Sequence, residues 1–156
     1  MKEYVRWPLV VFVILLIVAF LLRWAGRLDV HEVIRVYDGD TIQLDDGRTI
    51  RLIGVDAPEV DSPYSKAEPF GEESRAYLQR LLSGKKVSIK VGPTPVDRYG
   101  RTLAYVYVGD VLVNGRIIKD GWARAEMRFH HRCRDLFAAY EKEARAKRIG
   151  MWEHSP

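Results

Sequence analysis

The sequence has very little cysteine: Cys133 is the single thiol among 156 residues. A lone cysteine excludes a disulfide-stapled mini-protein and a zinc or iron–sulfur centre built from several cysteines. Internal repeats and low-complexity tracts are also absent. The apolar share of 47% and the aromatic share of 11% exclude disorder as the main state. The length suits one ordinary globular domain, with or without an appendage.

Excess charge of either sign is also scarce, and it is unevenly placed. The chain has 25 Lys and Arg residues against 21 Asp and Glu residues, a net charge of +4. Residues 1–27 hold four basic residues and one acidic residue, a net of +3, which leaves a net of +1 for residues 28–156. A basic chain suits nucleic acid or a lipid surface, but here any preference for nucleic acid must come from local placement of charge.

An uncharged apolar run extends from Trp7 to Leu22 and is bounded by Arg6 and Arg23. As a helix, its 16 residues span roughly 24 Å, against about 30 Å for the hydrocarbon core of a bilayer. Trp7 and Trp24 suit the two interfaces, and the arginines can snorkel outward to close the gap.

We therefore expect an uncleaved membrane anchor over residues 1–27, in contact with the bilayer through residues 7–24, followed by one domain over 28–156. The short N-terminal tail predicts that this domain faces out of the cytoplasm. A cleaved signal peptide, which would give a secreted protein, stays open, although cutting after Ala25 would leave Arg23 where a small residue belongs. A buried globular helix is the third alternative, but the run has no polar stripe.

The sequence after the apolar run, residues 28–156, predicts a β-rich domain. Alternating and β-branched segments, separated by turn signals at Asp38-Gly39 and residues 45–47, predict strands. The expected strands are 30–37, 41–44, 48–54, 86–91 and 102–108, and the expected helices are 72–82, 111–120 and 133–148. This order excludes a doubly wound sheet. The predicted fold class is α+β, mainly β: a five-stranded OB-fold barrel with three helices, preceded by one N-terminal transmembrane helix.

Three polar segments stand at turns or strand ends: residues 38–41, 51–59 and 97–101. If their strands are neighbours, the carboxylates of Asp40 and Asp56 converge as hard oxygen ligands for Ca²⁺ or Mg²⁺. Three residues past Asp56, Glu59 would face the metal without binding it.

Two arginines in these segments add the chemistry of phosphate recognition. Arg51 and Arg101 present guanidinium forks that match phosphate oxygens. Together with a metal and a carboxylate base they describe phosphodiester cleavage. Each segment alone is more simply a turn, a loop or a solvated charge, but their occurrence together at strand ends favours a site.

Over about residues 30–153 the sequence resembles the thermonucleases, the staphylococcal nuclease-like family. The matching stretches are residues 33–42, 51–59, 97–105, 113–114, 121 and 150–152. The resemblance implies an OB-fold barrel with three helices, and Ca²⁺-dependent hydrolysis of DNA and RNA to 3′-phosphorylated products.

The same resemblance implies roles for the acidic residues. Asp40 and Asp56 would bind Ca²⁺ through their carboxylates, and the backbone carbonyl of Ala57 would be a third ligand. Asp38 would lie behind these ligands and support them. Glu59 would position or deprotonate the attacking water.

Roles toward the substrate follow in the same way. Arg51 and Arg101 would clamp the phosphate and stabilise the transition state, while Arg98 and Tyr99 match positions that contact a neighbouring phosphate. The family uses two tyrosines beside the nucleotide base, where this chain has Met127 and Phe129. Phe129 can still stack on a base, whereas Met127 offers apolar contact only.

Two adjacent histidines and a cysteine follow Phe129 within four residues. His130, His131 and Cys133 lack a fourth metal ligand, so a surface loop is favoured over a metal site. The leading hypothesis is thus a membrane-anchored, calcium-dependent nuclease acting on DNA and RNA, with a monomeric domain and no obligate protein partner. The alternative is a non-catalytic OB-fold module that binds nucleic acid or protein, and such a module would be expected to lose some of the five site residues Asp40, Arg51, Asp56, Glu59 and Arg101.

Overall fold

The computed structural model describes residues 7–25, 29–63 and 66–153. The elements, in chain order, are α1 (Trp7–Ala25), β1 (Asp29–Val36), β2 (Thr41–Leu44), β3 (Thr49–Leu52), β4 (Val55–Asp56), α2 (Gly71–Leu82), β5 (Lys86–Val96), β6 (Thr102–Val108), β7 (Val111–Leu112), α3 (Val113–Lys119), β8 (Arg124–Ala125), α4 (Arg134–Ala146) and a 3₁₀ turn, η1 (Gly150–Trp152).

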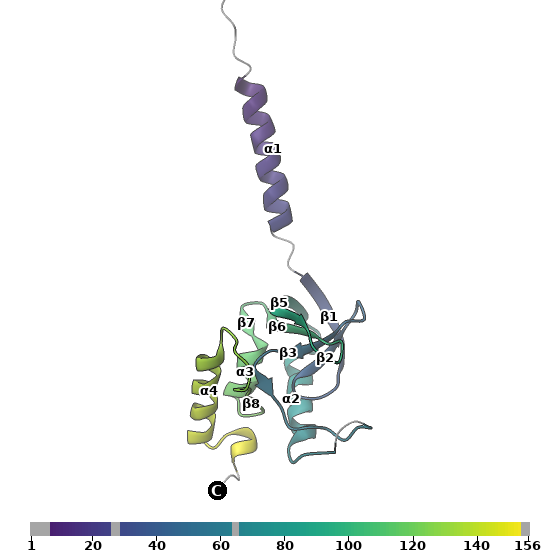
Figure 1. Ribbon diagram of the computed structural model, residues 1–156, viewed down its shortest axis with the longest axis vertical. Coiled ribbons are helices and arrows are strands. Elements are labelled where there is room, and N and C mark those ends of the chain that lie inside the picture. Colours follow the sequence, from purple (N-terminus) through teal and green to yellow (C-terminus); the bar gives the residue numbers. More distant parts are fainter. Residues whose placement is uncertain (1–6, 26–28, 64–65, 154–156) are drawn as a thin grey trace, which may run out of the picture.

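The main sheet curls into a barrel. Its strand order is β3-β2-β1-β5-β6-β7, and a further pairing of β3 with β6 closes it (Figure 1). That closing pair is parallel and sets Arg51 opposite Leu103, while the other pairs of this sheet are antiparallel. The prediction of an α+β fold built on a five-stranded OB-like barrel is confirmed, with β7 as a short addition at the sheet's edge.

The core lies inside the barrel and under the helices. Strands β2 and β3 turn alternate residues inward, as their period of two dictates. Fully buried members include Ile42, Leu44 and Ile50 from these strands, Ile117 from α3 and Phe137 from α4. A smaller cluster of Ala144, Met151 and Trp152 fixes the end of the chain against α4. These inward residues leave the alternate, outward positions of β2 and β3 free for polar side chains.

Several short elements differ from the prediction. The segment 111–120, expected as one helix, begins as β7 and becomes helical only at Val113, because Val111 and Leu112 pair with Val108 and Tyr107. Strands β4 and β8 pair with each other as a separate two-stranded sheet that was not predicted. Strand β5 continues past Val91, where the register shifts and Pro93 and Pro95 are tolerated before Val96 pairs with Thr102.

The N-terminal apolar run is helical, as α1. Large apolar side chains from Val10 to Val18 are exposed along it. No helix in the part of the chain that the structure describes is long and apolar enough to cross a membrane, so the predicted span is not found there. The flanking charges Lys2, Arg6 and Arg27 lie outside the described residues.

Candidate active site

The turn between β1 and β2 sets up the acidic part of the site. Inside it, the backbone N–H of Asp40 donates to Oδ1 of Asp38 at 2.8 Å. Gly39 is required here, because a Cβ at this position would lie 2.6 Å from Cβ of Ala57 and would collide with Ser74 of α2. The turn is therefore packed tightly between α2 and the segment that follows β4.

Asp40 is the central carboxylate, and only 4% of its surface is exposed. Its Oδ1 accepts a hydrogen bond from the Thr41 hydroxyl at 2.9 Å, and its Oδ2 accepts one from the backbone N–H of Ala57 at 3.0 Å. Oδ1 also forms an ion pair with Nη1 of Arg51. The structure thus brings Asp40 into direct contact with the backbone of Ala57 and with the guanidinium of Arg51.

Arg51 sits on the outer side of β3, opposite Thr41 in the β2–β3 register. Burial lowers the pKa of its guanidinium, whereas the nearby charges of Asp38, Asp56 and Glu59 raise it. Arg101 is also close enough to lower that pKa. Asp38, Asp56, Glu59 and Arg101, which come from separate segments of the chain, are therefore all within electrostatic reach of Arg51.

Arg101 is oriented by the turn that precedes β6. Its Nε donates to Oδ2 of Asp97 at 2.8 Å and its backbone N–H donates to Oδ1 at 3.0 Å. Its Nη1 reaches toward the hydroxyl of Thr41 at 3.5 Å. Arg101 is thus connected to Asp40 through Thr41, because the closed barrel sets β6 beside β3.

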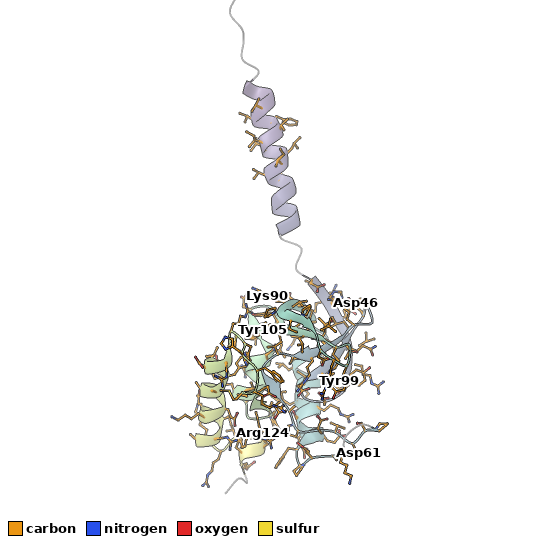
Figure 2. All side chains as sticks on the ribbon, in the orientation of Figure 1. Asp46, Asp61, Lys90, Tyr99, Tyr105 and Arg124 are labelled. Carbon is orange, nitrogen blue, oxygen red and sulfur yellow. The ribbon has the colours of Figure 1, made fainter. Side chains whose placement is uncertain are left out.

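Tyr99 and Arg98 flank this arginine at the tip of the same turn. The Tyr99 ring is 66% exposed, with the guanidinium carbon of Arg98 at 4.7 Å and that of Arg101 at 5.4 Å from its centroid. Nη2 of Arg98 donates to the Tyr99 hydroxyl at 2.6 Å. Tyr99, labelled in Figure 2, is accordingly available to a ligand bound at Arg101.

The donor set around Asp40 fits a hard divalent cation. Asp40 and Asp56 offer carboxylate oxygens and Ala57 offers a backbone carbonyl, which is the oxygen chemistry that Ca²⁺ prefers. Burial raises the pKa of Asp38, although Arg51, Thr41 and Arg101 oppose that effect. The local excess of carboxylates over guanidinium groups suits a bound cation, which would compensate it.

The same site also fits an anion beside that cation. Nη1 of Arg51 pairs with Oδ1 of Asp40. The guanidinium has further N–H donors, and their fork matches the oxygens of a phosphate.

The segment after β8 borders the site on the Asp56 side. Met127 is 40% and Phe129 is 69% exposed, and the Arg128 guanidinium lies 5.9 Å from the centre of the Phe129 ring. The hydrogen bond to Glu126 is the main cause of the raised pKa of Arg128, and the charge of Asp56 adds to it, so this segment lies within electrostatic reach of a predicted cation ligand. Met127 and Phe129 are therefore exposed beside the site. Among the described residues, neither forms a hydrogen bond to the acidic residues of the site.

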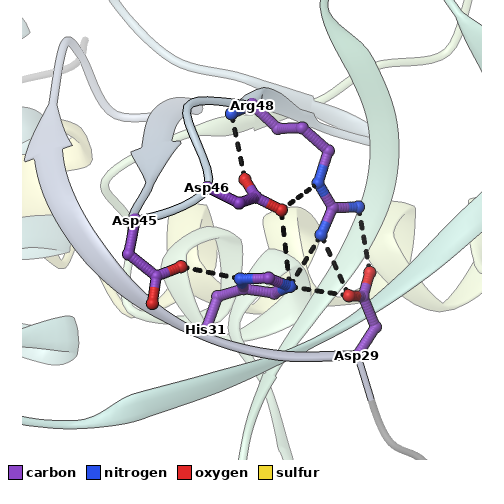
Figure 3. Close-up of polar contacts among 5 residues, drawn as sticks. All are labelled: Asp29, His31, Asp45, Asp46 and Arg48. Carbon is purple, nitrogen blue, oxygen red and sulfur yellow. Dashed lines mark hydrogen bonds and ion pairs between the residues drawn. The ribbon is translucent and has the colours of Figure 1, made fainter.

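A second group of metal-binding residue types lies at the opposite end of β1. Within the described ranges, His31, Asp45 and Asp46 have ligand atoms within 4.8 Å of one another (Figure 3). Nδ1 of His31 is 2.7 Å from Asp45 and Nε2 is 2.6 Å from Asp29, while Arg48 pairs with Asp29 and Asp46. His31, Asp45 and Asp46 thus belong to a network of ion pairs and hydrogen bonds with Asp29 and Arg48.

Sequence reasoning did not assign roles to several residues that organise the site. Thr41 links Asp40 to Arg101, and Asp97 orients Arg101. Asp97 stands four residues before Arg101 across a Tyr-Gly turn, a spacing that could have indicated the contact. Glu126 lies near enough for Arg51 to lower its pKa, after the larger effects of Arg128 and of burial; nothing in the local sequence signals this.

Comparison with known proteins identifies the family of this chain. Residues 49–154 match the family described as staphylococcal nuclease homologue. The thermonuclease of Staphylococcus intermedius is 40% identical over 123 residues, which is 76% of this chain and 73% of that protein. The thermonuclease of Staphylococcus hyicus is 38% identical over 128 residues, 80% of this chain and 76% of that protein. Endonuclease YncB of Bacillus subtilis is 33% identical over 127 residues, 78% of this chain and 60% of that protein. The chain belongs to the staphylococcal nuclease family.

Proposed function

We propose that the protein is a calcium-dependent nuclease that hydrolyses DNA and RNA and leaves 3′-phosphorylated products. The observation that carries this proposal is the convergence of Asp40, Ala57 and Arg51 in direct contact, with Arg101 joined to them through Thr41. Its membership of a family of nucleases supports the same conclusion.

In this proposal Asp40, Asp56 and the carbonyl of Ala57 hold Ca²⁺, which when bound supplies positive charge next to the scissile phosphate. Arg51 and Arg101 bind non-bridging phosphate oxygens and stabilise the charge that grows on them in the transition state. Tyr99 and Arg98 contact the neighbouring phosphate, and Phe129 stacks on a base with Met127 beside it.

Glu59 completes the chemistry from the exposed edge of the site. Its carboxylate orients a water molecule toward phosphorus and accepts the proton that the water loses. The bond between phosphorus and the 5′ oxygen breaks, the phosphate stays on the 3′ side, and the 5′ oxygen takes a proton from solvent. One water molecule is consumed for each bond cleaved.

The test is digestion of single-stranded DNA, double-stranded DNA and RNA by the full chain with Ca²⁺, with Mg²⁺ or with a chelator. We expect cleavage with Ca²⁺ and none with chelator. The products should have free 5′-hydroxyls, which a polynucleotide kinase labels directly, and 3′-phosphates, which block extension by a polymerase until a phosphatase removes them. Cleavage that persists in chelator would contradict the metal assignment. Tight binding without cleavage would favour the rival hypothesis of a non-catalytic OB-fold module.

We also propose that the N-terminal segment tethers the domain to a membrane, with the domain outside the cytoplasm. The support is the uncharged run from Trp7 to Leu22 and the exposure of its apolar side chains between Val10 and Val18. Full-length protein should stay with membranes after an alkaline carbonate wash, and a C-terminal reporter should be active only outside the cytoplasm. A mature N-terminus beyond Ala25 would instead establish a cleaved signal peptide.

A further inference from the structure

His131 is a buried histidine whose ring nitrogens are both left without a partner. The residue is 7% exposed, and neither Nδ1 nor Nε2 has a hydrogen-bond partner among the described residues. The predicted surface loop is therefore wrong for His131, although the adjacent His130 is exposed. The ring nitrogens of a buried histidine are usually hydrogen-bonded, so the burial of His131 needs another explanation.

The ring packs against the chain just before a predicted cation ligand. A Cβ on Gly54 would lie 2.6 Å from Nε2 of His131 and 2.8 Å from Cδ2 of Phe137, so the imidazole fills the space that a side chain at 54 would need. Gly54 also has a φ of +75°, which favours glycine. His131 and Phe137 pack against each other with ring centroids 5.4 Å apart and ring planes tilted by 46°.

Gly54 leads directly into the β4–β8 pair. The backbone N–H of Glu126 donates to the carbonyl of Gly54 at 3.1 Å, and Asp56 lies opposite Arg124 in the register. This two-stranded sheet is separate from the barrel sheet. Because each of its strands has only two residues, this sheet has few backbone hydrogen bonds to fix Asp56. The position of Asp56 therefore also depends on the packing of the imidazole of His131 against Gly54.

We propose that His131 is a positioning residue of the nuclease site: its uncharged ring wedges beneath Gly54 and holds the segment 54–56 against 124–126, so that Asp56 faces the cation. The inference rests on the proposed function. It assigns to His131 a role that acts through Asp56, with no contact to substrate.

The surroundings of the ring favour its uncharged form. Burial lowers the pKa of His131, and the charges of His130 and Arg134 lower it further. The backbone and charge of Glu126 act in the opposite direction, and Phe137 and Gly54 contribute no titratable group. A protonated ring would carry a buried charge opposed only by Glu126, so acid should push the ring out and release Asp56.

The experiment compares the full-length wild type with His131→Phe, His131→Ala and His130→Phe. Ca²⁺ affinity is measured by calorimetry, and kcat and KM are measured between pH 5 and pH 8. Phe keeps a flat ring but cannot be protonated, so His131→Phe should keep the affinity near neutral pH and lose less of it in acid than the wild type. His131→Ala removes the wedge and should weaken Ca²⁺ binding about tenfold, the usual effect of removing a residue that orients a metal ligand. His130→Phe should match the wild type.

Ile117→Val separates positioning from general stability, because Ile117 is buried in the main core. It should lower the unfolding temperature without changing the Ca²⁺ affinity. The inference is overturned if His131→Ala binds Ca²⁺ like the wild type, or if His131→Phe has the acid sensitivity of the wild type. If His131→Phe does not fold, as judged by circular dichroism, His131→Leu replaces it. Absence of cleavage by the wild type would contradict the proposed function, whereas the calorimetric comparison would still decide the role of His131.

Discussion

Glu59 is an exposed residue three positions after Asp56, and it acts on Arg51 through space. If it serves as the base, Glu59→Gln should lower kcat by about 10²–10⁴-fold, the usual contribution of a general base, and should change KM little. Steady-state cleavage of a fluorogenic oligonucleotide measures both constants. Glu68→Gln is the matched control, since Glu68 is exposed and its backbone N–H bonds to the carbonyl of Glu59. Equal kcat values for the two variants would remove Glu59 from the mechanism.

Arg101 presents a fork whose direction is set by Asp97 and Thr41. Lysine would keep the charge but lose the two parallel donors. We expect Arg101→Lys to lower kcat by about 10²–10³-fold, as for loss of one donor to transition-state charge. Arg98→Lys is the control at the exposed tip of the same turn, and its main effect should be on KM. If kcat is unchanged in Arg101→Lys, a positive charge at position 101 is enough to stabilise the transition state and the guanidinium fork is not needed.

Most of the site's residues could be predicted from the sequence because each lies in a short local motif. Asp40 and Arg101 are recognisable from the turns that contain them, whatever the rest of the fold does. His131 could not be predicted correctly, because its burial depends on Gly54 and Phe137, which are distant in the chain. A histidine in a polar stretch gives no local sign of such long-range packing.

At the scale of elements, one buried asparagine connects α3 to β6 and to the turn between β3 and β4. Asn114 is fully buried; its Nδ2 donates to the carbonyls of Ile53 and Ala104 at 2.9 and 3.1 Å, and its Oδ1 accepts from the N–H of Val106 at 2.9 Å. Asn114→Ala removes three hydrogen bonds to backbone groups, so we expect a loss of about 3 kcal/mol in the free energy of unfolding, at about 1 kcal/mol per bond.

Urea denaturation measures that loss. Gln79→Ala, at an exposed position on α2, should change the free energy of unfolding by less than about 0.5 kcal/mol. A loss below about 1 kcal/mol for Asn114→Ala would mean that water replaces the missing amide.

The network around His31 joins the start of β1 to the turn between β2 and β3, and it predicts a pH-dependent stability. The hydrogen bond to Asp29 raises the pKa of His31; burial opposes this, and Asp45 adds to it. A raised pKa contributes stability that is present below about pH 6.5, the usual pKa of histidine, and is lost as the pH rises through the folded-state pKa. The pKa values of Asp29, Asp45 and Asp46 are lowered, so their contribution is lost as the pH falls through those values. The network is strongest at weakly acid pH.

His31→Gln tests this network through the unfolding temperature. The variant should be less stable than the wild type at pH 6, and the difference should shrink at pH 9. The exposed His130, changed to Gln, should give no such pattern. An equal difference at both pH values would show that His31 contributes through packing and not through charge.

The long strands and helices were predictable, whereas the two-residue strands were not. Alternation over four or more residues marks β2, β3 and β6, but Val55-Asp56 and Arg124-Ala125 are too short to show any period. They become strands only because tertiary packing brings them together. Since β4 carries Asp56, the least predictable element is also the one that positions a proposed cation ligand.

At the scale of the whole molecule, the near-neutral charge of residues 28–156 predicts a weak salt dependence of substrate binding. If only Arg51, Arg98 and Arg101 contact phosphates, a plot of log KM against the logarithm of the salt concentration should have a slope of about +2. Each contact contributes about 0.7 to this slope for a single strand. The basic residues between Arg124 and Arg148 form the alternative, an extended track for nucleic acid.

Kinetics with a single-stranded oligonucleotide at several potassium chloride concentrations, at saturating Ca²⁺, give that slope. Arg98→Ala should lower it by roughly 0.7, the share of one contact, and Arg145→Ala on α4 should leave it unchanged. A slope of about 5 or more, reduced by Arg145→Ala, would establish the extended track.

The parallel pair between β3 and β6 has a consequence for when the protein can act. Arg51 and Arg101 are 50 positions apart and come together only when this last seam of the barrel closes. Contacts of such long range form late and together with the rest of the fold. An incompletely folded chain therefore lacks the paired arginines that the proposed cleavage of nucleic acid needs. Closure of the barrel assembles them in a single step.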